Sequence, residues 1–108
     1  MSYNVKTIPR FEKELKRLAK KYPSLKAEYI ALVKSLSENP EQGISIGNRC
    51  FKIRISIISK GKEKSGGERV ITYIQIADSE VYLLSIYDKS EQENISDKEL
   101  AALLLFIG

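Results

Sequence analysis

Cationic and tyrosine side chains recur in three sequence segments that alternate like β-strands. Lys52 and Arg54 lie in the first segment, Arg69 and Tyr73 in the second, and Tyr87 in the third. Arginine offers a planar fork to phosphate oxygens, lysine offers a mobile charge, and tyrosine offers a ring on which an unpaired base can stack. These residue types suit contact with a phosphodiester backbone, although a mixed sheet surface can also be merely solvent-exposed.

The same side chains could cut RNA without a metal ion. Cleavage needs a base that takes the 2′-hydroxyl proton, cations that stabilise the transition state, and an acid that protonates the leaving oxygen. The chain has no histidine and a single cysteine, Cys50, so a zinc site of the usual type cannot be assembled. We expect no metal and no cofactor. These three roles would fall to Lys, Arg, Tyr or a carboxylate, and lysine or tyrosine could act as the base only if surrounding positive charge lowered its pKa.

Charge is distributed unevenly along the chain. Residues 1–34 hold nine Lys and Arg against three acids, and residues 49–69 hold seven against two. Residues 78–99 reverse this with seven acids against two lysines. The polarity indicates an anionic partner, with nucleic acid as the default candidate. Solvated helix faces are the alternative interpretation of the N-terminal cluster.

Two amphipathic helices precede the strand segments. Residues 3–8 alternate weakly as a short strand, and Pro9 suits the first turn of the helix that follows. Apolar side chains then recur at helical spacing over residues 11–22 and again over 25–36, on either side of Pro23. The pattern predicts an antiparallel helix pair joined by a short turn.

Residues 43–89 have the pattern of two β-hairpins, with turns at Gly47-Asn48 and Asp78-Ser79. Strict alternation gives one nearly pure hydrocarbon face, which includes Tyr82 and Leu84 and should be covered by the helices. We call the opposite face the cationic face. Its predicted members are Lys52, Arg54, Ser56, Arg69, Ile71, Tyr73, Gln75, Val81, Leu83, Ser85 and Tyr87.

The chain ends in a predicted short helix. Ser96 and Glu99 form a capping box before an apolar stripe that begins at Leu100. The length suits one domain, residues 1–108, and no apolar run approaches the roughly 20 residues that span a bilayer. We therefore expect a cytoplasmic protein with no membrane partner.

Two segments carry a resemblance to a known family: FKIRISIISKGKEKSGGERVITYI and VYLLSIYDKSEQENISDKEL. The first has an arginine-bearing strand, a Lys-Gly loop and an S-G-G-x-R-V motif, and the second has Tyr-x-Lys before an acidic stretch. Together with the order of elements from Tyr3 to about Leu104, they resemble the RelE/ParE superfamily of toxin–antitoxin toxins. They resemble the HigB-like branch of RelE more than the gyrase-directed ParE branch.

The resemblance implies an α+β fold of the RelE-like microbial RNase type. In this fold an N-terminal strand and a two-helix hairpin pack on an antiparallel sheet that is followed by a short C-terminal helix. It also implies a toxin that cleaves messenger RNA on the ribosome by 2′-hydroxyl attack, without a metal. A cognate antitoxin protein, commonly encoded beside the toxin, would neutralise it.

The resemblance also assigns residues. Arg54 matches the strand arginine, Arg69 the arginine that opens the next long strand, and Tyr87 with Lys89 the C-terminal pair, so these four are the expected catalytic residues. Ile86 stands where relatives often place a histidine, which leaves the base unassigned, and Glu68 is a further acid near the site. The expected RNA-binding residues are Lys52, Lys60, Lys62, Lys64 and Tyr73.

Two other functions fit the sequence. A ParE-like toxin would share the fold but bind gyrase, and it would cause DNA-damage signalling while messenger RNA stays intact. A non-catalytic RNA-binding or partner-binding module would bind RNA tightly and in a salt-sensitive way without forming a product.

Overall fold

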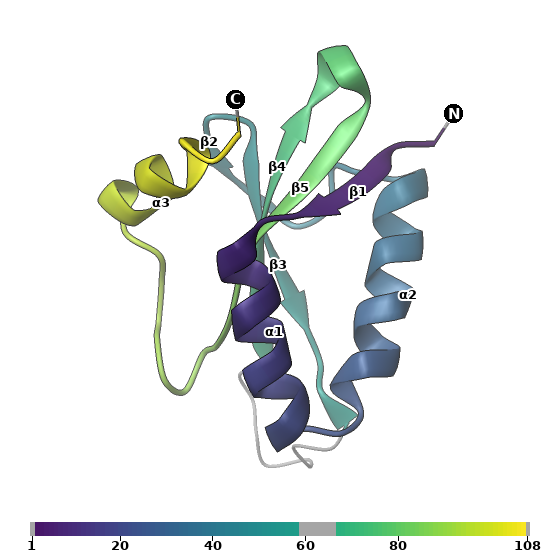
Figure 1. The fold of residues 1–108 in the computed structure, drawn as a ribbon, viewed down its shortest axis with the longest axis vertical. Coiled ribbons are helices and arrows are strands. Elements are labelled where there is room, and N and C mark those ends of the chain that lie inside the picture. The colour runs from purple at the N-terminus through teal and green to yellow at the C-terminus, as the bar shows by residue number, and fades with distance from the viewer. Residues whose placement is uncertain (1, 59–66, 108) are drawn as a thin grey trace.

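The computed structural model describes residues 2–58 and 67–107, and it contains one mixed five-stranded sheet with helices on both faces (Figure 1). The strand order is β1-β5-β4-β3-β2, in which β1 is parallel to β5 and the other neighbours are antiparallel. The predicted α+β fold class is confirmed. The elements are β1 (Asn4–Thr7), α1 (Pro9–Lys21), α2 (Leu25–Glu38), β2 (Ile44–Gly47), β3 (Cys50–Ile55), β4 (Glu68–Gln75), β5 (Glu80–Asp88) and α3 (Asp97–Leu104).

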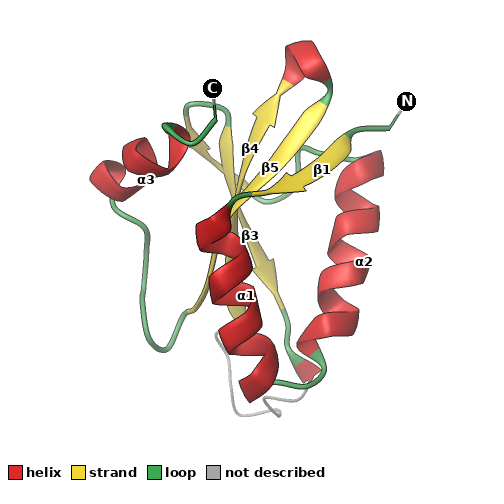
Figure 2. Cartoon of the chain, in the orientation of Figure 1, coloured by secondary structure: helices red, strands yellow, loops and turns green. Residues whose placement is uncertain are grey.

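The helices α1 and α2 cover one face of the sheet (Figure 2). Pro9 occupies the first turn of α1, where its missing N–H has no helical partner to lose. The apolar stripes of both helices are buried, with Phe11, Leu18, Leu25 and Leu36 fully inaccessible. Across residues 2–58 and 67–107, no helix combines the length and apolarity that a bilayer-spanning segment needs.

A β-bulge in β5 changes which side chains share a face. Ile71 of β4 pairs with Ser85, but its neighbour Thr72 pairs with Leu83, so β5 contains one extra residue, Leu84. An extra residue reverses the alternation on one side of the bulge. The prediction from strict alternation is therefore wrong for residues 81–83.

The residues before the bulge exchange faces. Val81 and Leu83 pair with the helix-facing residues of β4 and are fully buried, although they were predicted on the cationic face. Tyr82 was predicted beneath the helices, but it lies beside Tyr73, with ring centroids 6.4 Å apart. The cationic face therefore gains a third tyrosine, beside Tyr73 and Tyr87, and loses two aliphatic side chains.

The first hairpin turns one residue later than predicted. Gly47 pairs with Cys50, so the two turn residues are Asn48 and Arg49 rather than Gly47-Asn48. Both have positive φ, +55° and +61°, as a type I′ turn requires. Arginine thus occupies a turn position that normally favours glycine.

Helix α1 also covers an edge of β5. The strand β1 pairs with β5 only as far as Leu83, which leaves the following N–H groups of β5 without a β1 partner. The Glu14 carboxylate accepts hydrogen bonds from the Ile86 N–H at 3.2 Å and from the Ser85 hydroxyl at 2.9 Å. A side chain of α1 thereby holds the strand segment that leads to Tyr87.

We predict that alanine is tolerated far better at Gly47 than at Gly43. Both glycines have φ near +90°, but a Cβ at Gly43 would overlap the Lys52 carbonyl oxygen, whereas none of the described atoms lies within 4 Å of a Cβ at Gly47. Gly47→Ala should lower the free energy of unfolding by about 1 kcal/mol, and Gly43→Ala by about 1–3 kcal/mol more. Urea unfolding of both variants measures the difference, and equal losses would contradict the proposed overlap.

Candidate nucleic-acid interface

Three of the four predicted catalytic residues form a row across the sheet. Arg54 of β3 is directly opposite Arg69 of β4, and Arg69 is directly opposite Tyr87 of β5. Directly paired residues project to the same face, and neighbouring strands lie about 4.8 Å apart. We call these three residues the arginine–tyrosine row. The predicted juxtaposition on the cationic face is confirmed by the strand register.

The members of the row differ in accessibility. Arg54 is exposed and Arg69 is half-buried, whereas Tyr87 is only 3% exposed. The Tyr87 hydroxyl is buried and makes no hydrogen bond with any described residue. Burial raises the pKa of Tyr87, and the negative charge of Glu99 also raises it while Arg69 opposes the shift. Tyr87 therefore keeps its proton in this arrangement and does not meet the condition for acting as the base.

The remaining predicted residues lie around the row. Lys52 lies on β3 two residues before Arg54, and Lys89 is an exposed residue directly after β5. Tyr73 lies four residues beyond Arg69 on the same face of β4. Glu68 is fully buried, and its neighbouring position in β4 places it on the face opposite to Arg69. Lys60, Lys62 and Lys64 fall outside the described residues.

An acidic linker, residues 89–96, connects β5 to α3 and is held by basic side chains. Glu91 pairs with Arg17 at 2.9 Å and with Lys21 at 3.5 Å, both from the outer surface of α1. Lys52 donates a hydrogen bond to the Asn94 side chain at 2.9 Å. The linker thus lies along residues that would otherwise be available to phosphate, and Figure 1 shows it running beside α1.

Two further contacts fix the ends of the linker. Asp88, fully buried at the end of β5, accepts hydrogen bonds from the Tyr22 hydroxyl at 2.9 Å and from Ser90. Glu99 at the start of α3 pairs with Arg10 at 3.2 Å. The hydrogen bond from Arg10 lowers the pKa of Glu99, as the one from Arg17 lowers that of Glu91. These ion pairs persist above the ordinary carboxyl pKa and weaken only as the pH falls through the lowered values.

Helix α3 covers the middle of the cationic face. Ile71, between Arg69 and Tyr73 on that face, is fully buried, and so are Leu100 and Leu103 of α3. Beyond Ile71, Leu104 and Ile107 line a pocket together with Tyr73. The sequence prediction left this face open to solvent. The apolar stripe of the last helix was the signal that a sheet surface had to receive it.

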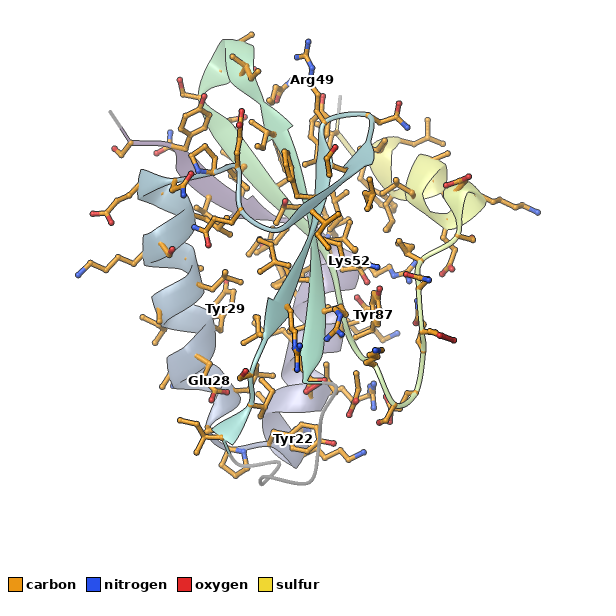
Figure 3. The ribbon with its side chains drawn as sticks, turned by 180° about the vertical axis from the view of Figure 1, so that it is seen from behind. Tyr22, Glu28, Tyr29, Arg49, Lys52 and Tyr87 are labelled. Carbon is orange, nitrogen blue, oxygen red and sulfur yellow. The ribbon has the colours of Figure 1, made fainter. Side chains whose placement is uncertain are left out.

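Figure 3 shows the molecule from behind the view of Figure 1 and labels side chains from several of its elements. Lys52 and Tyr87 lie near the centre of the sheet, close to the linker, and Arg49 projects from the end of the first hairpin. Tyr22 lies at the other end, below the sheet. Because Ile71 is buried between Arg69 and Tyr73, the cationic face has one part with the arginine–tyrosine row and another with Arg49 and Tyr73.

A family model described as the RelE toxin of the RelE / RelB toxin-antitoxin system matches residues 10–106. The chain belongs to the RelE toxin family. Among solved structures, a free mutant of the E. coli toxin RelE is 16% identical, with a TM-score of 0.65 and full coverage of both chains. A RelBE2 toxin-antitoxin complex from Mycobacterium tuberculosis is 17% identical, with a TM-score of 0.60, over 82% of this chain and 99% of that one. The intact E. coli RelBE complex is also 17% identical, with a TM-score of 0.59, over 79% of this chain and 94% of that one. At these identities the likeness shows that the RelE fold is shared.

We predict that Tyr87→Phe leaves stability unchanged or raises it by up to about 1 kcal/mol. The substitution removes a buried hydroxyl that has no partner among the described residues. The matched control is Tyr22→Phe, which removes the hydrogen bond that the Tyr22 hydroxyl donates to the buried Asp88 carboxylate and should cost about 1–3 kcal/mol. Urea unfolding compares the two, and a large loss for Tyr87→Phe would show that its hydroxyl is bonded in solution.

We also predict that the Glu91 ion pairs hold the linker in place. Glu91→Gln should increase amide hydrogen exchange at linker residues such as Gln92 by about two- to fivefold, the scale of an exposed ion pair. Glu93→Gln is the control, because Glu93 is exposed and forms no ion pair with the described residues. The difference between the variants should shrink at 1 M salt. Equal exchange in both variants at low salt would argue against an electrostatic restraint.

Proposed function

We propose that this RelE-family toxin is a metal-independent endoribonuclease of the HigB-like branch that cleaves messenger RNA on the ribosome. The observation that supports it most directly is the arginine–tyrosine row, which brings two cations and a phenol together across three strands. The exposed guanidinium of Arg54 and the half-buried one of Arg69 can approach the same phosphate. Two cations beside one phosphate stabilise the extra charge that it gains in the transition state.

The chemical step would be an internal displacement at phosphorus. A base takes the 2′-hydroxyl proton, the 2′-oxygen bonds to phosphorus, the bond to the 5′-oxygen breaks, and an acid returns a proton to that oxygen. The products are a 2′,3′-cyclic phosphate and a 5′-hydroxyl. Because burial raises its pKa, Tyr87 keeps its proton and suits a positioning role as a hydrogen-bond donor. Lys89, or a lysine among residues 59–66, would assist the base.

RNA must displace part of the surroundings of Tyr87 before it can contact the buried hydroxyl. The linker lies near the row, because Lys52, two residues before Arg54 on β3, donates a hydrogen bond to Asn94. The contacts between linker and α1 are exposed ion pairs, which contribute little individually and compete with phosphate for the same cations. We infer that substrate binding includes exchange of linker carboxylates for RNA phosphates.

The proposed protein partner is a cognate antitoxin encoded beside the toxin. Two of the similar structures are complexes of RelB antitoxins with their toxins. An antitoxin with an acidic or amphipathic segment would be complementary to the basic surface of this chain, whose net charge is +4. Because the toxin would act on ribosome-bound messenger RNA, we propose that it acts in the cytoplasm.

A non-catalytic RNA-binding module is a second candidate, and the burial of Tyr87 is the observation that favours it. Arg54 and Lys89 are exposed at the surface, while Tyr87 is only 3% exposed. Such a protein would bind RNA and arrest growth without forming cleavage products. Transcript mapping separates this function from that of a nuclease.

We predict that Arg69→Ala abolishes growth arrest and transcript cleavage while the protein stays folded. Loss of one cation at the phosphate should lower the cleavage rate about 10²- to 10³-fold. The control is Lys34→Ala, which removes an exposed cation of α2 and should remain toxic. Primer extension after brief induction should show codon-registered cuts in wild type and control only. Intact transcripts during growth arrest by wild type would refute the nuclease and leave RNA or gyrase binding.

A further inference from the structure

A pocket of about 350 Å³ lies on the cationic face beyond α3, separate from the arginine–tyrosine row. This volume is within the roughly 300–1,000 Å³ that is typical of small-molecule sites. The lining residues come from the turn of the first hairpin, from the second half of β4 and from the end of the chain. They are Asn48, Arg49, Tyr73, Gln75, Leu104 and Ile107.

The chemistry of this lining matches one unpaired nucleotide. The half-buried Tyr73 offers an aromatic surface, and Leu104 and Ile107 offer aliphatic contacts. The side-chain amides of Gln75 and Asn48 each have donors and acceptors, which suits the edge of a base. Stacking on an aromatic ring combined with hydrogen bonds to a base edge is the usual way in which proteins hold a splayed RNA base.

Arg49 supplies a cation at the rim of this pocket. It is exposed and forms no ion pair with any residue in the described part of the chain. Its side chain projects from the hairpin end, away from the body of the sheet (Figure 3). A guanidinium in that place can bind the phosphate that joins a pocketed base to the rest of an RNA strand.

The backbone of Arg49 is an independent sign of function. Its φ of +61° lies in the left-handed region, where glycine would relieve the strain at the second residue of a type I′ turn. Strained non-glycine residues persist where the side chain is needed for another reason. Neither a salt bridge nor burial explains this arginine, because its side chain is exposed.

The pocket also lies at a useful distance from the row. Tyr73 is four residues along β4 from Arg69 on the same face, which corresponds to about 13 Å. The buried Ile71 and α3 lie between them, so one nucleotide cannot occupy both sites. A base in the pocket would belong to a nucleotide a short way along the strand from the scissile phosphate, or to structured RNA beside it.

We propose that this pocket, which we call the Tyr73 pocket, is a nucleotide subsite that stacks one unpaired RNA base on Tyr73 and binds its phosphate through Arg49. The identity of the ligand as RNA rests on the proposed function. The existence of the pocket and its preference for a base with a phosphate do not depend on cleavage.

The first test is a titration of the ¹⁵N-labelled full chain with each of the four ribonucleoside 5′-monophosphates. We expect amide shifts concentrated at the lining residues, which saturate with a Kd of about 1 mM or tighter. Ribose 5-phosphate, which lacks a base, should bind at least about tenfold more weakly, and Tyr73→Leu should lose the preference for the nucleotide. No shifts at the lining residues, or equal binding of ribose 5-phosphate, would overturn the proposal.

The second test uses Arg49→Gly, for which the proposal predicts effects of opposite sign. Glycine relieves the positive-φ strain, so the midpoint of thermal unfolding should rise by a few degrees, while nucleotide binding should weaken about tenfold. Arg49→Lys keeps both the strain and a charge and should bind at an intermediate level. Lys13→Gln removes an exposed charge from α1 and should leave both quantities unchanged. Unaltered nucleotide binding by Arg49→Gly would remove Arg49 from the site.

The two proposals fail in different ways. Arg69→Ala should eliminate transcript cleavage and still bind nucleoside monophosphates in the Tyr73 pocket. If wild type binds nucleotides in the pocket but cleaves no transcript, the proposed nuclease is wrong and the subsite stands. If wild type cleaves transcripts but shows no nucleotide shifts at the pocket, the subsite is wrong and the nuclease stands.

Discussion

The register of β3, β4 and β5 is the constraint on which the candidate sites depend. Direct pairing of Arg54 with Arg69, and of Arg69 with Tyr87, places cations from separate strands around one point of the sheet. A slip of one residue in either ladder would send one member of the row into the apolar core. The bulge at Leu84 changes which face the preceding residues of β5 occupy. It brings Tyr82 beside Tyr73 and turns Val81 and Leu83 toward the helices.

Acidic side chains of this protein pair with basic side chains that could otherwise bind an anionic ligand. Glu91 of the acidic linker pairs with Arg17, and Glu99 of α3 pairs with Arg10, so both acids neutralise part of the basic surface of α1. Carboxylates in these positions lower the net positive charge of the surface, and they compete with an anionic ligand for the same basic side chains. Arg54, Lys89 and Arg49 are exposed, so a polyanion could contact them first.

Much of the fold could be predicted from the spacing of apolar residues and from the proline and glycine residues at the ends of helices and strands. The helices, the strand segments, the capping box and the shared face of Arg54, Arg69 and Tyr87 follow from local patterns that the structure confirms. The bulge could not be predicted, because Leu84 is as apolar as its neighbours and only the pairing with β4 makes it the extra residue. The turn was misplaced because Gly47-Asn48 resembles a hairpin signal, whereas Gly47 in fact pairs with Cys50. The burial of Tyr87 and the pocket beyond α3 depend on contacts between segments that are far apart in the chain, and a local sequence pattern does not predict such contacts.

The hydrogen bonds that Glu14 makes with β5 affect how this sheet can meet other chains. An uncovered strand edge is a template for pairing with a foreign strand, and folded proteins protect such edges. Where β1 stops, Glu14 occupies the Ile86 N–H that an incoming strand would need. At the opposite side, β2 is an edge strand of only four residues that ends in a glycine. Few backbone groups at the sheet edges are therefore open to pairing with a strand of a second copy, although aliphatic side chains such as Ile44 are exposed.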